Sequence, residues 1–321
     1  MPEISTDHIG IAEKSLSVEI PLVSVCMITY NHENYVRQAI ESVLSQQADF
    51  AIELVISDDG STDETGQVCR DFEKKNLQIV RYIKNDSNIG MMPNFIKALQ
   101  LCKGKYIALC EGDDYWINDY KLKKCVQALD EHPEYTLCCH ENYKLISGKI
   151  SIDNILKISA PGRYTLEDYL LQPFFHTSSM VFRRVDLIPH IPDWYKNVFA
   201  GDNFLVAILG SQGDIYYLNE CMSVYRVHAA SISNKYGILN MKENYLKHMN
   251  LFNQMNNFKY DDIIKKLTRK WELITFCYDE KYGRKLKYFL KNISGIWRVY
   301  ASPQIKMSLF IRYIVPTKFV K

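Results

Sequence analysis

The chain has 321 residues, of which 47% are hydrophobic and 24% charged, and this balance excludes a disordered, fibrous or collagen-like protein. Its length allows one large domain or two ordinary ones. No apolar run reaches the roughly 18 residues that a membrane-spanning helix needs, and the first twenty residues lack the apolar core of a secretory signal. In the absence of an export signal, the nine cysteines predict reduced thiols and a cytoplasmic protein.

Charge is divided unevenly along the chain. Residues 281–321 hold ten of the 39 Lys and Arg residues and no Asp or Glu. The first 280 residues therefore carry 29 basic and 37 acidic groups, a difference of −8. An acidic body argues against a nucleic-acid partner, whereas the basic, amphipathic tail predicts a peripheral contact with an anionic membrane surface. The alternative is that the apolar stripe of the tail packs on the catalytic domain.

Strand and helix signals alternate four times between residues 22 and 130. Before them, residues 1–20 lack periodicity and predict a loose leader. Asn34 is expected to cap the first helix, and Gly104 to end the third. Apolar β-rich runs predict strands at 22–29, 52–56, 79–84 and 106–110, and helical spacing predicts helices at 35–44, 63–75, 92–102 and 121–129.

This alternation predicts a parallel sheet covered by helices on both faces, with its ligand beyond the carboxyl ends of the strands. From residue 135 to 230 the pattern is less regular, with aromatic and β-rich pieces, and from Lys242 onward it is helical.

Two acidic clusters follow predicted strands and should face one crevice. The first reads Ser-Asp-Asp-Gly-Ser-Thr-Asp from Ser57 to Asp63. These residues suit an ordinary turn, but a carboxylate there could also accept a hydrogen bond from a ligand, such as a base N–H. The second cluster is Glu111, Asp113 and Asp114, whose three carboxylates repel one another unless they are solvated or bind a divalent cation.

A metal held by so few carboxylates takes its other ligands from water and phosphate oxygens, which indicates a diphosphate-bearing substrate. The chain contains neither G-x-x-x-x-G-K-[ST] nor G-x-G-x-x-G. A P-loop kinase and a classical dinucleotide dehydrogenase are therefore poor interpretations.

Four segments in fixed order carry a resemblance to a known family. They are the run Val-Ser-Val-Cys-Met-Ile-Thr-Tyr-Asn at 23–31, the turn at 58–63, Asn88-Ile89-Gly90 with Asn94, and Gly-Lys-Tyr-Ile-Ala at 104–108 leading into Asp113-Asp114. Together they resemble the N-terminal half of a family 2 glycosyltransferase with the GT-A fold. The resemblance is strong over residues 22–130 and weaker to about 230.

The resemblance implies an α/β protein of the GT-A type, with a mostly parallel sheet flanked by helices, and the helical pattern and basic charge of the later residues predict a helical, basic C-terminal region. The catalytic domain would span residues 21–235, with a nucleotide-binding half at 21–133 and an acceptor half at 134–235, and the helical region would span 236–321. It also implies an inverting transferase that uses a nucleotide-diphosphate sugar, here a UDP-sugar, and Mn²⁺ or Mg²⁺.

The same resemblance assigns roles to individual residues. Asp59 would read the base, Asp113 would lie beside the ribose, and Asp114 would bind the metal. Because the element reads Glu-Gly-Asp-Asp, either Glu111 or Asp113 could share the metal with Asp114. The other residues implied for the nucleotide pocket are Thr29, Tyr30, Glu33 and Asn94.

An inverting transfer needs a general base for the acceptor hydroxyl. In the family this is an acidic residue at the start of a helix beyond the metal motif, and Asp202 fits that place. The family often has Glu-Asp here, whereas this chain has Gly201-Asp202. Asp202 could instead be a helix N-cap, and Asp168 and Asp214 are weaker candidates for the base.

Tyr225-Arg226-Val227-His228 supplies a cation and an imidazole. If this segment is extended, Arg226 and His228 point to the same side, where they could hold the diphosphate and complete the metal shell. The alternative is an ordinary surface strand end. His176, among aromatic residues, is a candidate for the acceptor side or simply a packed histidine.

The leading hypothesis is a metal-dependent inverting glycosyltransferase at the cytoplasmic face of the membrane. Its acceptor would be a glycan or lipid-linked hydroxyl in surface polysaccharide synthesis. An inactive glycosyltransferase-like binding or scaffold protein is one alternative. The other is a sugar nucleotidyltransferase, which would need a Gly-rich, Arg-containing loop after the first strand, where this chain has residues 30–34, Tyr-Asn-His-Glu-Asn.

Overall fold

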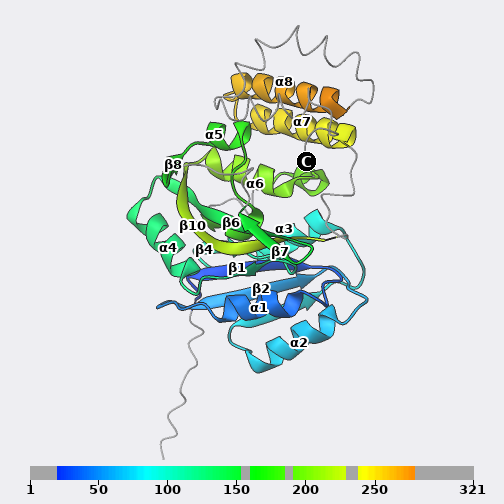
Figure 1. Cartoon of the computed structure of the whole chain (residues 1–321), viewed down its shortest axis with the longest axis vertical. Helices are drawn as coiled ribbons and strands as arrows, with labels where there is room; N and C mark the ends of the chain where they lie inside the picture. Colours follow the sequence, from blue (N-terminus) through cyan, green and yellow to red (C-terminus); the bar gives the residue numbers. More distant parts are fainter. Residues whose placement is uncertain (1–19, 153–159, 185–190, 229–237, 279–321) are drawn as a thin grey trace, which may run out of the picture.

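A single mixed sheet runs through the computed structural model, which describes residues 20–152, 160–184, 191–228 and 238–278, with helices on both faces (Figure 1). The order of its strands is β3-β2-β1-β4-β9-β6-β10-β5, with β7 beside β6 and β8 beside β10. The strands are β1 (Val23–Thr29), β2 (Ile52–Asp58), β3 (Val80–Lys84), β4 (Tyr106–Leu109), β5 (Tyr115–Trp116), β6 (Tyr135–Ile146), β7 (Lys149–Ile152), β8 (Gly162–Tyr164), β9 (Val181–Arg183) and β10 (Asp214–Val227). The expected α/β sheet flanked by helices is confirmed.

Parallel pairing joins β3, β2, β1 and β4, and it also joins the two long strands β6 and β10. The short strands β5, β7, β8 and β9 pair antiparallel. From β1 the chain moves outward to β2 and β3 and then returns to β4 on the other side of β1. This reversal opens a crevice beyond the carboxyl ends of β1 and β4, where open α/β sheets bind their ligands.

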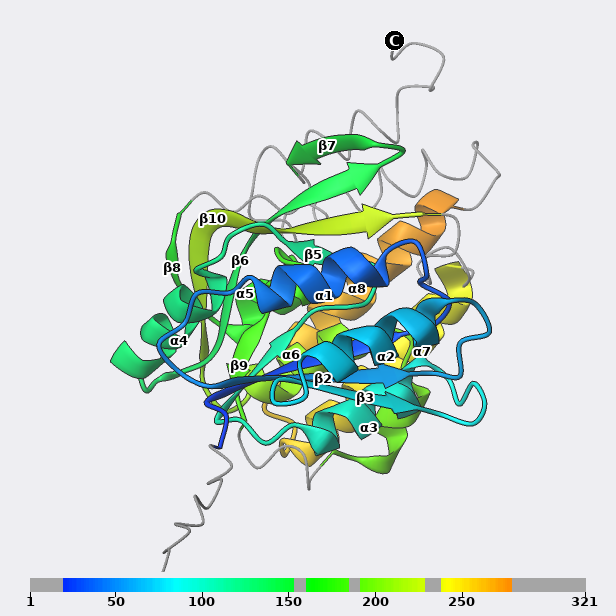
Figure 2. The ribbon, with the colours of Figure 1, turned by 90° about the horizontal axis from the view of Figure 1, so that it is seen from below.

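Alternating residues along the strands pack into two separate hydrophobic cores. Val25 and Met27 of β1 belong to one core and Cys26 to the other, as the two-residue period of a strand requires. The first core is covered by α1 (Val36–Leu44), α2 (Thr65–Lys75) and α4 (Lys121–Glu131). Figure 2 shows α1 and α2 side by side on this face.

The second core is built in part from the other α-helices that the structure describes. They are α3 (Met91–Leu101), α5 (Leu166–Leu171), α6 (Gly201–Gly210), α7 (Ile238–Met255) and α8 (Asp261–Tyr278). The helices α7 and α8 pack on each other, and Lys270 Nζ of α8 donates a hydrogen bond of 2.7 Å to the carbonyl of Leu171 at the end of α5. The C-terminal helices are thereby tied to the layer that carries α6.

Two local expectations were wrong. The N-cap of α1 is Tyr35, not Asn34, and no side chain caps this helix. Gly104 is not the helix cap either, because α3 ends at Cys102 in an extended conformation. A Cβ atom at Gly104 would lie 2.5 Å from the backbone nitrogen of Ser24, so this glycine allows close packing against β1.

The basic tail predicted to meet a membrane, residues 281–321, lies outside the described residues. Among the helices that the structure does describe, none is both long and apolar enough to cross a membrane. Eight of the nine cysteines, from Cys26 to Cys221, are free thiols.

Candidate active site

The loops after β1 and β2 are bound to each other at the carboxyl edge of the sheet. Asn31, whose φ is +54°, accepts a 2.9 Å hydrogen bond at Oδ1 from Thr62 N, and its own N–H donates to Ser61 Oγ at 2.9 Å. Glu33 continues this contact, since its Oε2 accepts from Glu64 N at 3.1 Å. Glu33 thus has a structural partner at the rim, and its contact with a nucleotide stays a prediction.

Thr29 and Tyr30 lie at the end of β1 and differ in exposure. Tyr30 is 40% exposed, which leaves its ring free to pack against a ligand. Thr29 is buried, and its Oγ1 has no hydrogen-bond partner among the described residues. A Cβ atom at Gly112 would lie 2.6 Å from Thr29 Oγ1 and 3.0 Å from His32 Nδ1, so only glycine fits at this point of the acidic loop.

Asp59 and Asn94 are turned toward the protein. Asp59 Oδ1 accepts from Ile89 N at 2.8 Å, and its Oδ2 accepts from Gly90 N at 3.0 Å, so this carboxylate holds the loop before α3. Asn94 is 1% exposed, and its amide bonds Ser57 on β2. Their roles in nucleotide binding remain predictions, and the structure gives each one a clear task in shaping the pocket wall.

Asp113 lies between two imidazoles. His228 Nε2 donates to Asp113 Oδ2 at 3.0 Å, and His32 Nε2 is 3.8 Å from the same oxygen. One ligand atom from each of these three residues lies within 4.8 Å of the others, a spacing that could hold a metal ion. Burial alone would raise the pKa of Asp113, but the hydrogen bond from His228 and the charges of both imidazoles bring that pKa below its ordinary value.

Asp114, the next residue along the chain, is completely buried. Its Oδ1 accepts a 2.9 Å hydrogen bond from Arg226 N, whereas its Oδ2 has no hydrogen-bond partner among the described residues. Burial, together with the charge of Asp113, raises its pKa well above the ordinary value, although Ser178 and Arg226 act in the opposite direction. A buried carboxylate oxygen without a partner is where a cation would relieve the cost of burial.

Arg226 reaches the same point from the end of β10. Its Nη1 donates to the backbone carbonyl of Asp113 at 2.6 Å, and its Nη2 donates to Gln38 of α1. The guanidinium also lies 4.4 Å from the ring centroid of Tyr115 and 5.2 Å from that of Tyr35. Arg226 and His228 therefore both contact Asp113, as expected for an extended segment, and Arg226 is committed to fixing the acidic loop.

Glu111 and Asp202 lie close enough for the charge of Asp202 to act on Glu111. Burial raises the pKa of Glu111, and the charges of Asp113, Asp114 and Asp202 raise it further. Burial also raises the pKa of Asp202, while the N–H and side chain of Asn203 and the charge of His176 lower it in part. Around Glu111, carboxylate charge is thus concentrated, and a cation would offset it.

The structure separates Asp202 from the other two candidates for the base. Asp202 lies in the first turn of α6, but the N-cap is Ala200, so capping does not explain this aspartate. Asp168 forms a capping box with Thr165 at the start of α5, and Asp214 pairs with Arg163 Nε at 2.5 Å. Both alternatives therefore have structural roles, and Asp202 is the one of the three whose charge raises the pKa of Glu111.

His176, predicted to lie on the acceptor side, is packed against an aromatic ring. Its ring is stacked on Tyr225, with centroids 4.3 Å apart and planes at 10°. The pair forms a flat aromatic surface close enough for the charge of His176 to lower the pKa of Asp202.

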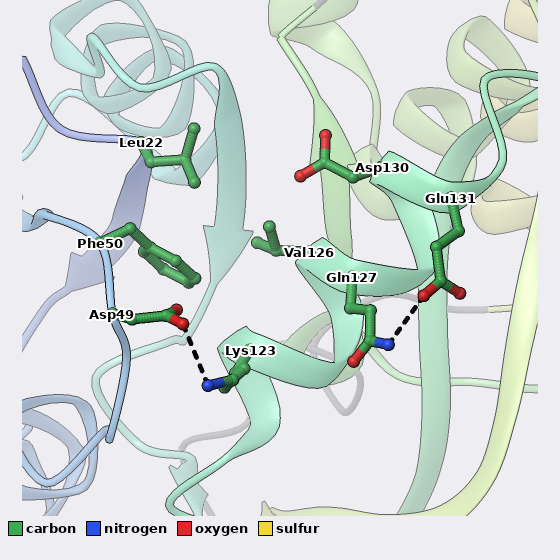
Figure 3. Close-up of a pocket in the computed structure, with 8 residues that line it drawn as sticks. All are labelled: Leu22, Asp49, Phe50, Lys123, Val126, Gln127, Asp130 and Glu131. Atoms are coloured by element: carbon green, nitrogen blue, oxygen red, sulfur yellow. Dashed lines mark hydrogen bonds and ion pairs between the residues drawn. The ribbon is translucent and has the colours of Figure 1, made fainter.

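A shallow pocket elsewhere carries none of this chemistry. It lies between α4 and the start of β1 and is lined by Leu22, Phe50 and Val126 with an ion pair of Lys123 and Asp49 (Figure 3). Because Leu22 precedes β1, the pocket is at the amino edge of the sheet, opposite the acidic crevice.

Sequence reasoning missed three contributors to the site. His32 joins the cluster around Asp113, Tyr35 packs on Arg226, and Asn203 contacts Asp202. For His32 a signal was available, since an imidazole directly after the first strand must lie at the carboxyl edge of the sheet.

Comparison with known sequences gives one family and several relatives. The sequence model of glycosyl transferase family 2 matches residues 24–188. An uncharacterized protein of Mycobacterium tuberculosis is 36% identical over 210 residues, which are 65% of this chain and 60% of that protein. TuaG of Bacillus subtilis, whose name refers to teichuronic acid biosynthesis, is 29% identical over 220 residues, 67% of this chain and 82% of TuaG.

Solved structures share the fold at low sequence identity. S. aureus TarS in complex with UDP-GlcNAc has a TM-score of 0.63 and 20% identity, over 84% of this chain and 77% of that one. The mannosyltransferase PcManGT from Pyrobaculum calidifontis, in complex with GDP-Man and Mn²⁺, has a TM-score of 0.53 and 14% identity, over 93% of this chain and 87% of that one. Since the family match covers more than half of the 321 residues, the chain belongs to glycosyl transferase family 2.

Proposed function

We propose that this protein transfers a sugar from a UDP-sugar to a hydroxyl of a glycan or lipid-linked acceptor, with inversion at the anomeric carbon. The observation that carries the proposal is the position of Asp202, in the first turn of α6 and close enough to the acidic loop after β4 for its charge to raise the pKa of Glu111. A base on one side and a site for a diphosphate on the other are the two requirements of a single displacement.

The donor would bind at the carboxyl ends of β1 and β2. Exposed Tyr30 offers a ring and exposed Glu33 a carboxylate, and Thr29, Asp59 and Asn94 form the buried wall behind them. The structures of TarS with UDP-GlcNAc and of PcManGT with GDP-Man support a nucleotide-sugar donor for this chain, because the fold is shared. The choice of uridine rests on the resemblance alone.

The residues present fit a divalent cation. Asp113, His228 and His32 offer one oxygen and two imidazole nitrogens. Asp114, adjacent to Asp113 in the sequence, would be a further ligand through its unpartnered Oδ2. Imidazole ligands suit Mn²⁺ better than Mg²⁺, which prefers oxygen ligands only. The bound ion would stabilise the negative charge that builds on the leaving diphosphate.

Asp202 would act on the acceptor. It takes the proton from the acceptor hydroxyl as that oxygen attacks the anomeric carbon, and the bond from this carbon to the diphosphate breaks with its electron pair going to the diphosphate. Burial raises the pKa of Asp202, which makes this carboxylate a stronger base than an exposed one. The stacked rings of His176 and Tyr225 would bind the acceptor sugar.

Asp202→Asn tests the proposal against Asp168→Asn as a matched control. Asp202→Asn should bind UDP and Mn²⁺ normally but transfer sugar about 10²- to 10⁴-fold more slowly, the usual worth of a positioned base. Asp168→Asn should keep its transfer rate and lose only stability. Transfer by Asp202→Asn at the wild-type rate, or retained anomeric configuration in the product by NMR, would contradict the mechanism.

A second part of the proposal concerns location. The basic tail at residues 281–321 would attach the enzyme peripherally to the cytoplasmic face of an anionic membrane, where a lipid-linked acceptor arrives. TuaG, by its name, supports a role in surface polysaccharide synthesis. Salt-sensitive sedimentation with anionic liposomes that is lost on truncation at residue 281 would support attachment, and a full-length protein that stays in the supernatant would refute it.

A further inference from the structure

Asp202 is the end of a short chain of side-chain hydrogen bonds that begins in another helix. Asn203 Nδ2 donates to Asp202 Oδ1 at 3.3 Å, and the hydroxyl of Tyr169 donates to Asn203 Oδ1 at 3.1 Å. Tyr169 belongs to α5, whereas Asp202 and Asn203 open α6.

Asn203, the middle residue of these hydrogen bonds, can donate to Asp202 in only one of the two orientations of its side-chain amide. The amide of Asn203 has a donor end and an acceptor end, and they exchange places when the amide turns over. With the hydroxyl of Tyr169 donating to Oδ1, the NH₂ group faces Asp202. The reverse orientation would set the amide oxygen against a carboxylate, which is repulsive when Asp202 is ionised.

Tyr169 is well suited to fix that orientation. Its side chain is 2% exposed, and its ring packs against Phe175 and Phe174 with centroid distances of 4.8 and 5.8 Å. Burial, with the charge of Asp202, raises its pKa well above the ordinary value, so the hydroxyl keeps its proton and remains a donor.

We propose that Tyr169 and Asn203 are positioning residues for the base, which hold Asp202 Oδ1 so that Oδ2 takes the proton of the acceptor. This inference rests on the proposed role of Asp202. Neither residue touches the reacting atoms, and Tyr169 acts only through Asn203.

Loss of one of these hydrogen bonds can be detected through the pKa of Asp202. A hydrogen bond donated to a carboxylate favours its ionised form, so loss of the Asn203 donor should raise the pKa of Asp202. The fall of kcat at acid pH would then begin at a higher pH. The other ionisable groups whose charges act with that of Asp202 are Glu111 after β4, His176 before η1 (Thr177–Ser179), Tyr169 of α5, Tyr195 of η3 (Asp193–Asn197) and Tyr245 of α7.

The test is a double-mutant cycle on sugar transfer with Tyr169→Phe and Asn203→Ala. Tyr169→Phe removes one hydroxyl and should lower kcat roughly three- to tenfold, the usual worth of one hydrogen bond, with the KM of the donor unchanged. In the Asn203→Ala background the same change should have no further effect. Tyr164→Phe is the matched control, because its ring packs on Phe174 at 5.0 Å but its hydroxyl bonds the carbonyl of Ala160.

The outcomes separate this inference from the proposed function. If Tyr169→Phe lowers kcat equally with and without Asn203, or does not lower it at all, the positioning role is refuted while Asp202 can still be the base. If Asp202→Asn transfers sugar at the wild-type rate, the base itself is wrong. If Tyr169→Phe folds poorly, Asn203→Ala is the decisive variant. An unchanged kcat and an unchanged fall of kcat at acid pH in Asn203→Ala would refute the inference.

Discussion

His228 Nε2 and Asp113 Oδ2 lie 3.0 Å apart, although 115 positions separate the two residues in the sequence. The contact joins the end of β10 to the loop after β4, and His32 approaches the same oxygen from the loop after β1. Three strand ends therefore converge on one carboxylate.

We expect this convergence to bind Mn²⁺. His228→Ala and His32→Ala should each weaken Mn²⁺ binding about ten- to a hundredfold, as loss of a ligand or of its support usually does. The measurement is the shift of the unfolding temperature with Mn²⁺ alone, since a ligand of the native state stabilises it by mass action. His132→Ala is the control, because this exposed histidine pairs with Glu134 far from the crevice, and an equal loss in that variant would contradict the assignment.

The same binding should depend on pH in a defined direction. Burial, with the charge of His228, lowers the pKa of His32 below its ordinary value, so this imidazole is neutral at pH 7 and free to bind a metal. Because the pKa of Asp113 is also lowered, its carboxylate stays ionised well into the acid range. Mn²⁺ affinity should therefore be constant above pH 7 and fall once the pH drops below about 6.5, where protons compete for imidazole nitrogens.

Titration with Mn²⁺ at pH 5.5, 6.5 and 7.5 measures this dependence. A Mn²⁺ affinity that rises on acidification would contradict these ligands. Ligands that must lose a proton before they bind the metal give an affinity that falls on acidification.

Asp114→Asn should increase the stability of the metal-free protein and decrease the activity of the enzyme. A carboxyl group whose pKa is raised on folding costs stability at every pH above its unfolded value, so at pH 7 the buried Asp114 destabilises the metal-free protein. Asparagine can still accept from Arg226 N, and its NH₂ group replaces the unpartnered oxygen. We expect roughly 1–2 kcal/mol of added stability without metal, and a loss of turnover by several powers of ten.

Thermal unfolding in EDTA and transfer assays with Mn²⁺ test the two halves of that expectation. Full activity of Asp114→Asn, or of the wild-type enzyme in EDTA, would show that the reaction needs no metal at this position.

Arg226→Lys should not be conservative. Lysine keeps the charge but cannot bond the carbonyl of Asp113 and Gln38 together, nor stack as a plane between Tyr35 and Tyr115. We expect a loss of about 2–3 kcal/mol in the free energy of unfolding, from one charged hydrogen bond and the ring contacts. Arg163→Lys, near the other end of β10, is the control and should change stability far less, because its ion pair is at the surface.

The sequence predicted the parallel half of the sheet and the side of it that carries the chemistry. The runs at 54–56 and 106–109 are apolar along both faces, as buried parallel strands are, and acidic residues follow each within two positions. Those local signals were sufficient to bring Asp59, Asp113 and Asp114 to one edge.

What the sequence did not reveal are the directions of side chains and the contacts between distant segments. Nothing in Asp113-Asp114 tells which carboxylate faces the crevice, because the answer depends on Arg226 N, which takes Asp114 inward. Asp202 has the appearance of an N-cap until the backbone shows that α6 begins after Ala200. Asp168 and Asp214 become poor candidates for the base only once their contacts with Thr165 and Arg163 are seen.

The order of strands has a consequence for the synthesis of the protein. The acidic loop is complete once residue 114 has been made, and His32 precedes it, but Arg226 and His228 come from the end of β10. A growing chain thus carries its crowded carboxylates without two of these three partners for more than a hundred further residues. The proposed capacity to hold a diphosphate and a metal ion would arise only after the end of β10 has been made, so an incomplete chain emerging from the ribosome would lack the complete site.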